Sequence, residues 1–251
     1  MYVACSTLCF SRLGLDAALK AIRDLHFAKA DLAIHPPGPH LTPEAVAADG
    51  PAVAKRLKAG NVPFAAFHLE VADPLGPDGR AHLKAVCRLA RLLAVPLLTV
   101  PPATADLGTE CERLGEWAKV ASADGVMLTV ETLTGTLTGD AATAVELCRK
   151  VPGLGLTLDP SHYLLDNQAG AGYDPLLPFV RHVRLRDSGR GPGQFQVRVG
   201  QGEVEYGRII TQLDRFKYDR ALSVDVRDVP DNPFPVEPEV RKLKYLLESL
   251  V

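Results

Sequence analysis

The sequence contains few cysteines, and their arrangement argues against a disulfide framework. Its 251 residues include five cysteines, an odd number scattered along the chain. Domains that depend on disulfides carry paired cysteines at a much higher density. A chain of this length buries most of its unfolded surface without such cross-links. We therefore expect structural thiols, Cys5 and Cys9 included, and a cytoplasmic protein.

Long hydrophobic runs and a strong excess of one charge are also missing. No apolar stretch approaches the ~20 residues that a transmembrane helix needs. The first residues, MYVACSTLCFSRLG, lack the basic and apolar regions of a signal peptide. The 28 basic and 30 acidic residues give a net charge of −2, which supplies no general attraction to nucleic acid. We expect neither a membrane nor a nucleic acid as partner.

Short β-rich apolar runs alternate with segments whose apolar residues recur at helical spacing. Eight such runs in 251 residues favour an α/β fold, one (β/α)8 TIM barrel that forms a single domain over residues 1–251. No glycine-rich fingerprint follows an early strand, so we expect no nucleotide cofactor. Thr42, before a proline, and Asp140 are predicted helix N-caps. The predicted strands are 2–6, 30–34, 64–69, 96–100, 126–131, 154–159, 182–186 and 222–226.

Polar residues close most of these strands. In a (β/α)8 barrel the functional groups lie at the C-terminal ends of the strands. Side chains two positions apart on a strand share a face, which groups Arg184 with His182 and Arg186. We therefore expect several strand-end side chains to converge above the barrel axis. They are Glu131, Asp159, Arg184 and Asp225.

Three converging carboxylates repel one another and need a positive partner. A divalent metal is one solution, since oxygen ligands suit Mg²⁺ or Mn²⁺ and added histidine suits Zn²⁺. An arginine is the other solution, because its guanidinium stays charged and pairs with carboxylates. The residues alone leave both solutions open.

Five segments carry a family resemblance: TVETLTG (129–135), LTLDPSH (156–162), HVRLRDS (182–188), GQGEVEYGRII (200–210) and LSVDV (222–226). Together they resemble the xylose-isomerase-like barrel superfamily. This group includes sugar-phosphate isomerases, ketose 3-epimerases, inosose dehydratases and the endonuclease IV group. The resemblance covers nearly the whole chain, and its more specific parts are the Asp-x-x-His of residues 159–162 and the glutamate that ends the fifth strand. It implies a small sugar or polyol substrate and allows a homodimer.

The resemblance also implies roles for individual residues. In ketose epimerases of this kind, two glutamates, an aspartate and a histidine hold a divalent metal. The two glutamates move a proton through an enediolate. Carried over, Glu131, Asp159 and Asp225 become the metal ligands. Glu131 and Asp225 also become proton-transfer groups, His162 becomes a general acid or polarises a substrate oxygen, and Arg184 stabilises the enediolate.

Two positions depart from the family pattern. Arg184 stands where the pattern has its histidine ligand, and His182 lies one layer deeper. Asp225 is one methylene shorter than the usual glutamate, and a base displaced by ~1 Å can cost ~100-fold in rate. Two placements of Arg184 stay open. Its guanidinium takes the place of a metal among the three carboxylates, or it points to a substrate phosphate or carboxylate while Mn, Mg or Zn is retained.

The glycine-rich segment 188–202 follows the seventh strand and contains Arg190 and Arg198. We interpret it as a lid over an anionic or polyhydroxy ligand, with a solvated surface loop as the alternative. The endonuclease IV group has an Asp-x-His metal pair in this loop. Gln194 and Gln196 stand there instead, which argues against DNA repair. The candidate substrate-binding residues are His35, His68, Glu70, Arg190 and Arg198.

The expected function is isomerisation or epimerisation of a sugar or sugar phosphate, by proton transfer through an enediolate. Two alternatives come from other classes. A catalytically silent carbohydrate-binding barrel would explain the loss of the histidine ligand at Arg184. A dehydratase of the inosose type would use the same carboxylates. The fold alone does not choose among them.

Overall fold

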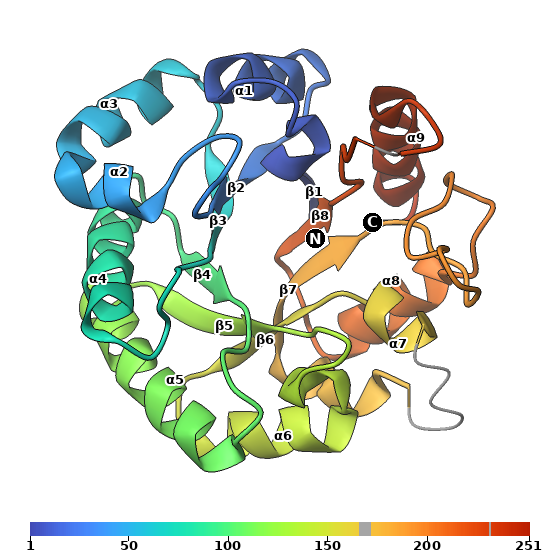
Figure 1. Cartoon of the computed structure of the whole chain (residues 1–251). Coiled ribbons are helices and arrows are strands. Elements are labelled where there is room, and N and C mark those ends of the chain that lie inside the picture. The colour runs from blue at the N-terminus through green and yellow to red at the C-terminus, as the bar shows by residue number, and fades with distance from the viewer. Residues whose placement is uncertain (166–171, 231) are drawn as a thin grey trace.

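The computed structural model describes residues 1–165, 172–230 and 232–251. Eight parallel strands close into a barrel in chain order, with β1 paired to β8. Figure 1 looks into the barrel and shows the helices as an outer ring. The predicted (β/α)8 barrel is confirmed. The strands are β1 (Tyr2–Ser6), β2 (Lys29–Ile34), β3 (Phe64–Leu69), β4 (Leu97–Val100), β5 (Met127–Glu131), β6 (Gly155–Leu158), β7 (Val180–Leu185) and β8 (Ala221–Val224).

Helices connect the strands and cover the outside of the sheet. Both predicted N-caps are confirmed: Thr42 Oγ1 accepts from the Ala45 N–H at 3.2 Å, and Asp140 Oδ2 accepts from the Thr143 N–H at 2.7 Å. The α-helices are α1 (Leu15–Asp24), α2 (Pro43–Ala48), α3 (Gly50–Ala59), α4 (Pro77–Leu92), α5 (Leu107–Ala123), α6 (Ala141–Lys150), α7 (Ser161–Leu165), α8 (Tyr206–Arg215) and α9 (Val236–Glu248). The 3₁₀ helices are η1 (Thr7–Phe10), η2 (Leu137–Gly139) and η3 (Asp174–Phe179).

The barrel interior changes from apolar to polar toward the C-terminal ends of the strands. Near the start of the strands a small alanine cluster fills the axis. Above it, the hydroxyl oxygens of Thr99, Thr129 and Thr157 lie 2.8–3.0 Å from one another. These contacts show that the three threonine side chains face the interior of the barrel. The alanines are Ala4, Ala65 and Ala221.

The larger apolar core lies between the sheet and the helices. Cys5 and Cys9 belong to it and are buried, and all five cysteines are free thiols, as expected. In the described parts of the chain, no helix is both long and apolar enough to cross a membrane.

Candidate functional site

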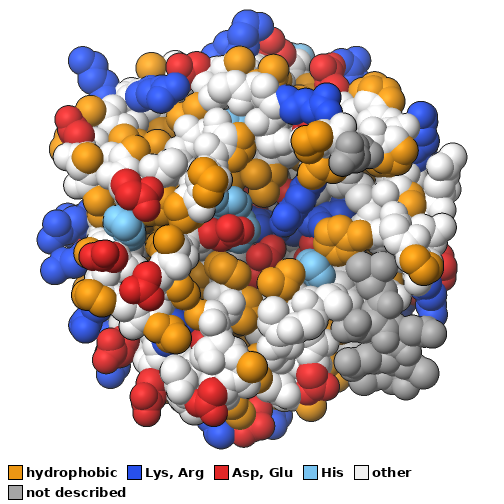
Figure 2. Space-filling model, viewed as in Figure 1, with side chains coloured by type: hydrophobic (Ala, Val, Ile, Leu, Met, Phe, Trp, Pro, Cys, Tyr) orange, Lys and Arg blue, Asp and Glu red, His pale blue; other side chains and the backbone are white. Residues whose placement is uncertain are grey.

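Charged side chains are buried where the strands end. Figure 2 shows basic, acidic and histidine side chains gathered in a hollow at the centre of the barrel face. Five charged residues at this end are at most 3% exposed. Burying so many charges is costly unless each one is paired, so the pairing defines the site. The five are Glu131, Asp159, Arg184, Arg186 and Asp225.

Arg184 pairs with Glu131 and with a carboxylate that the sequence analysis did not single out. Its Nη1 lies 3.1 Å from Glu131 Oε1, and its Nε lies 3.1 Å from Asp31 Oδ2. Nη1 also donates to His68 Nδ1 at 3.0 Å. His182 lies deeper, as expected, with Nε2 2.8 Å from Asp31 Oδ2. The hypothesis that Arg184 lies among Glu131, Asp159 and Asp225 is therefore wrong, because, of these three carboxylates, the Arg184 guanidinium pairs with that of Glu131 only.

Arg186 fills the position expected of Arg184. Its Nη2 lies 2.6 Å from Asp225 Oδ2 and 2.7 Å from Asp159 Oδ2. Arg227 adds a further positive charge, with Nε 3.4 Å from Asp225 Oδ2. Arg186 shares the inward face of β7 with Arg184 but lies just past the strand end. It therefore reaches the carboxylates that follow β6 and β8.

The arginines keep the buried carboxylates ionised. Burial opposes the ionisation of Glu131, but His68 and Arg184 outweigh it and hold the pKa of Glu131 well below its usual range. Burial likewise opposes the ionisation of Asp225, and Arg227 and Arg186 lower its pKa on balance. Both groups are therefore carboxylates, not acids, at neutral pH.

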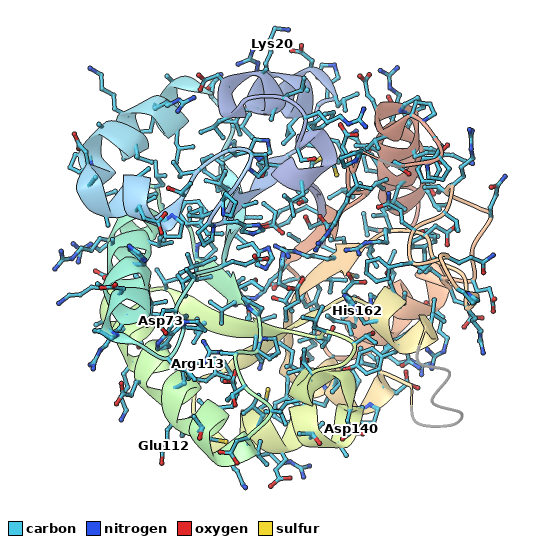
Figure 3. The ribbon with its side chains drawn as sticks, viewed as in Figure 1. Lys20, Asp73, Glu112, Arg113, Asp140 and His162 are labelled. Atoms are coloured by element: carbon cyan, nitrogen blue, oxygen red, sulfur yellow. The ribbon has the colours of Figure 1, made fainter. Side chains whose placement is uncertain are left out.

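His162 lies beside this cluster, on α7. Figure 3 shows it on the inner side of the helix ring, whereas Lys20 and Glu112 lie at the outer rim. Burial lowers the pKa of His162 on balance, although Asp159 raises it, so the ring is neutral at pH 7. The Thr134 N–H donates to His162 Nδ1 at 3.3 Å. This bond places the proton on Nε2, where His162 can donate to a ligand oxygen.

His35, His68 and Glu70 form a second group at the ends of β2 and β3. Each offers a ligand atom, and these atoms lie within 4.8 Å of one another. His35 Nε2 lies 3.1 Å from His68 Nδ1, and His35 Nδ1 lies 3.7 Å from Glu70 Oε1. Burial, together with His68 and Arg184, lowers the pKa of His35 to about 2. His35 is therefore neutral, and the positive charge nearby opposes any further cation.

The segment after β7 covers Arg186. The Phe195 ring centroid lies 4.5 Å from Arg186 Cζ and 4.8 Å from the centroid of the His162 ring. The Gln196 side chain fixes this segment by accepting from the Arg227 N–H at 2.6 Å and donating to the Arg227 carbonyl at 2.9 Å. Phe195 therefore forms an aromatic cover at the mouth of the barrel.

Arg190 and Arg198 have other partners. Arg190 Nε lies 2.8 Å from Glu203 Oε2, and Arg198 Nη1 lies 3.9 Å from Glu239 Oε1. Both arginines are about half exposed, at 56% and 48% of their side chains. Neither is brought to the carboxylate cluster, so their assignment to substrate binding stays a prediction.

A divalent metal does not fit among Glu131, Asp159 and Asp225 as the structure arranges them. The oxygens that would face the ion already face guanidinium groups of Arg184 and Arg186, at 2.6–3.1 Å. A dication placed there would lie next to two fixed positive charges, and that repulsion is strong in a buried site. The histidine group offers ligand atoms, but Arg184 already donates to one of them, His68 Nδ1.

Asp31, Arg227 and Phe195 belong to the site although they were not predicted from the sequence, and no role was predicted for Arg186. Asp31 carries a signal, because a carboxylate within an otherwise apolar strand needs a buried partner. Arg186 also carries a signal in the sequence, since it lies two positions after Arg184 and therefore shares its face of the strand. For Phe195 and Arg227 we find no signal in the sequence, because loop conformation places both.

The fold and its strand-end polar cluster define a (β/α)8 barrel with a candidate site at the mouth. Residues 19–246 match the family described as xylose isomerase-like TIM barrel. The match covers most of the chain, and the chain belongs to this family. No curated protein matches the chain.

Solved structures share the fold. A xylose isomerase domain protein from Planctomyces limnophilus is 16% identical, with a TM-score of 0.77, and the alignment covers 100% of this chain and 98% of that one. The D-allulose 3-epimerase from Methylomonas sp. is 14% identical, with a TM-score of 0.77 and 100% and 98% coverage. The 3-keto-D-glucoside 4-epimerase from E. coli is 12% identical, with a TM-score of 0.73 and 99% coverage of both chains. At these identities the similarity shows the fold alone.

Proposed function

We propose that the chain is a carbohydrate isomerase or epimerase that acts on a sugar or sugar phosphate at the mouth of the barrel. The observation that carries the proposal is the convergence of Glu131, Asp159, His162 and Asp225 in a barrel of this family. Several solved relatives are named as sugar epimerases, and one was solved in complex with D-allulose.

The proposed reaction begins with the transfer of one proton. Ionised Glu131 accepts a proton from the carbon beside the carbonyl, and the C–H electron pair forms the double bond of an enediolate. His162 Nε2–H donates a hydrogen bond to the oxygen that becomes negative. Delivery of a proton to the opposite face epimerises that carbon: Asp225, the proposed second proton-transfer group, first takes up a proton from solvent, and Glu131 later releases its own proton to solvent. Return to the neighbouring carbon isomerises the sugar.

The strength of Glu131 as a base determines how much stabilisation of the enediolate the other residues must provide. The lowered pKa of Glu131 makes it a weak base, so stabilisation of the enediolate oxygen must contribute much of the rate. Arg184 contributes through its fixed positive charge, as proposed from the sequence. His35, His68 and Glu70 line the same mouth and stay candidate contacts for substrate hydroxyls.

The test is deuterium incorporation from D₂O. Ketoses and ketose phosphates are incubated with the protein and followed by NMR at the carbon beside the carbonyl. Exchange with wild type and a loss of about 100-fold or more in Glu131→Gln are expected, the size of a general-base contribution. Glu112→Gln, at the outer rim, is the matched control. Undiminished turnover in Glu131→Gln would refute the assignment.

A carbohydrate-binding barrel without turnover is the second candidate. The observation that favours it is the engagement of all three carboxylates by arginines. It predicts that a sugar raises the melting temperature without any deuterium exchange. Dehydration, the third outcome, would appear in the same samples as loss of one water by mass spectrometry.

A further inference from the structure

One guanidinium nitrogen bridges two carboxylates that the family resemblance marks as metal ligands. Arg186 Nη2 lies 2.6 Å from Asp225 Oδ2 and 2.7 Å from Asp159 Oδ2. Asp159 follows β6 and Asp225 follows β8, so the two carboxylates come from different strands. The Arg186 guanidinium lies between them and pairs with both. All three side chains are fully buried.

We infer that Arg186 is the built-in cation of this barrel. Its guanidinium takes the position between Asp159 and Asp225 that a divalent ion would share, and no such ion binds there in the wild-type protein.

The surrounding charges support this replacement. Arg184 lies 3.1 Å from Glu131, and Arg227 lies 3.4 Å from Asp225, so each carboxylate of the expected metal site faces at least one arginine. Each of the three carboxylates therefore already has a positive partner. A dication would have to displace an arginine from a buried pair, which leaves a buried guanidinium without its partner and is unfavourable.

Arg186 also keeps hydrogen-bonding capacity that the fold does not use. Its Nε and Nη1 are buried and have no hydrogen-bond partner within the residues that the structure describes. Buried donors are normally satisfied, and an exception calls for a functional reason or a missing ligand. Phe195 covers the guanidinium. If the proposed function holds, these N–H groups are free to donate to a substrate oxygen once Phe195 moves aside.

The test measures binding of Mn²⁺, a cation that prefers oxygen ligands, by the loss of the free-ion signal in electron paramagnetic resonance. The full-length protein is titrated as wild type, Arg186→Ala and Arg190→Ala. Arg190 is an exposed arginine of the same loop and serves as the matched control. We expect no site in wild type or Arg190→Ala, and one new site in Arg186→Ala whose affinity for Mn²⁺ exceeds any residual binding by the wild type at least about tenfold. Arg186→Gln, which keeps polar donors without the charge, is used if Arg186→Ala does not fold.

Asp225→Asn tells where any wild-type ion lies. One equivalent of Mn²⁺ in wild type that Asp225→Asn abolishes would overturn the inference. Binding that survives Asp225→Asn but disappears in His35→Ala places the ion in the histidine group and leaves Arg186 in its role. Absence of a new site in folded Arg186→Ala or Arg186→Gln would also overturn it. None of these readouts requires turnover, so the inference and the proposed function can fail independently.

Discussion

Asp31 shows how one residue holds the centre of the barrel together. Its carboxylate is buried within β2 and accepts from both His182 and Arg184. Burial opposes its ionisation, yet Arg184 and His182 lower its pKa on balance. We predict that Asp31→Asn lowers the free energy of unfolding by about 3 kcal/mol, because Arg184 then lacks one of its buried anions. Urea denaturation measures the change.

Asp16 provides the matched control. It forms a two-bond ion pair with Arg56 on the surface, where its side chain is 69% exposed. Asp16→Asn should change stability by less than about 1 kcal/mol, since solvent screens exposed pairs. Equal losses in the two variants would show that Asp31 does not stabilise the buried cluster.

At the level of residues, the sequence predicted which side chains meet but not how they pair. Strand alternation was enough to group Glu131, Asp159 and Asp225 with the arginines of β7. It could not decide between Arg184 and Arg186, because long side chains reach partners through rotamers that no pattern records. The wrong choice followed from the family pattern, which marks position 184 and not position 186.

The loop after β7 is an element whose shape depends on Asp187. The Asp187 carboxylate accepts from the N–H groups of Gly200 at 2.6 Å and Gly202 at 3.1 Å. A Cβ at position 202 would lie 2.2 Å from Asp187 Oδ1 and 2.6 Å from the Ser188 carbonyl. We predict that Gly202→Ala lowers the free energy of unfolding by about 1–3 kcal/mol through this overlap.

Gly207 is the control for that substitution. It lies in the first turn of α8, and a Cβ there would meet nothing within 4 Å. Gly207→Ala should leave stability unchanged or raise it by up to about 1 kcal/mol, since alanine favours helix. Thermal unfolding of both variants compares them directly. Similar behaviour would show that the loop tolerates a side chain at 202.

The elements themselves were well predicted because their signals are local. Apolar runs and helical spacing found every strand, and the capping residues Thr42 and Asp140 marked helix starts. The register in which neighbouring strands pair could not be predicted from the sequence. The pairing of β6 with β7 shifts after Leu156, so that Thr157 lies opposite His182. A shift of this kind depends on how neighbouring strands pack and leaves no mark in the sequence of either one.

For the molecule as a whole, buried neutral histidines predict sensitivity to acid. Burial lowers the pKa of His35 to about 2 and also lowers that of His40. A histidine with a lowered pKa in the folded state takes up its proton on unfolding, so stability falls as the pH drops below ~6.5. His35 alone contributes up to ~1.4 kcal/mol per pH unit in that window. Urea denaturation from pH 8 to pH 5 measures the slope.

His35→Gln should make the dependence of the free energy of unfolding on pH less steep, by the contribution of one proton. His26→Asn, at an exposed histidine with a left-handed backbone that asparagine accepts, is the control variant. A further loss is expected below about pH 4, because the lowered pKa values of Glu131 and Asp225 stabilise the fold only above the ordinary carboxyl pKa. An unchanged slope in His35→Gln would contradict the assignment.

The guanidinium between Asp159 and Asp225 changes where the positive charge of the site comes from. A metal centre depends on supply: the ion must be present, chosen over its competitors and retained against chelators. Arg186 is translated with the chain, so the charge arrives with every copy and is in place as soon as β7 joins the sheet. The site is then finished by folding alone. A site with a fixed arginine also cannot change its chemistry by exchanging one metal ion for another.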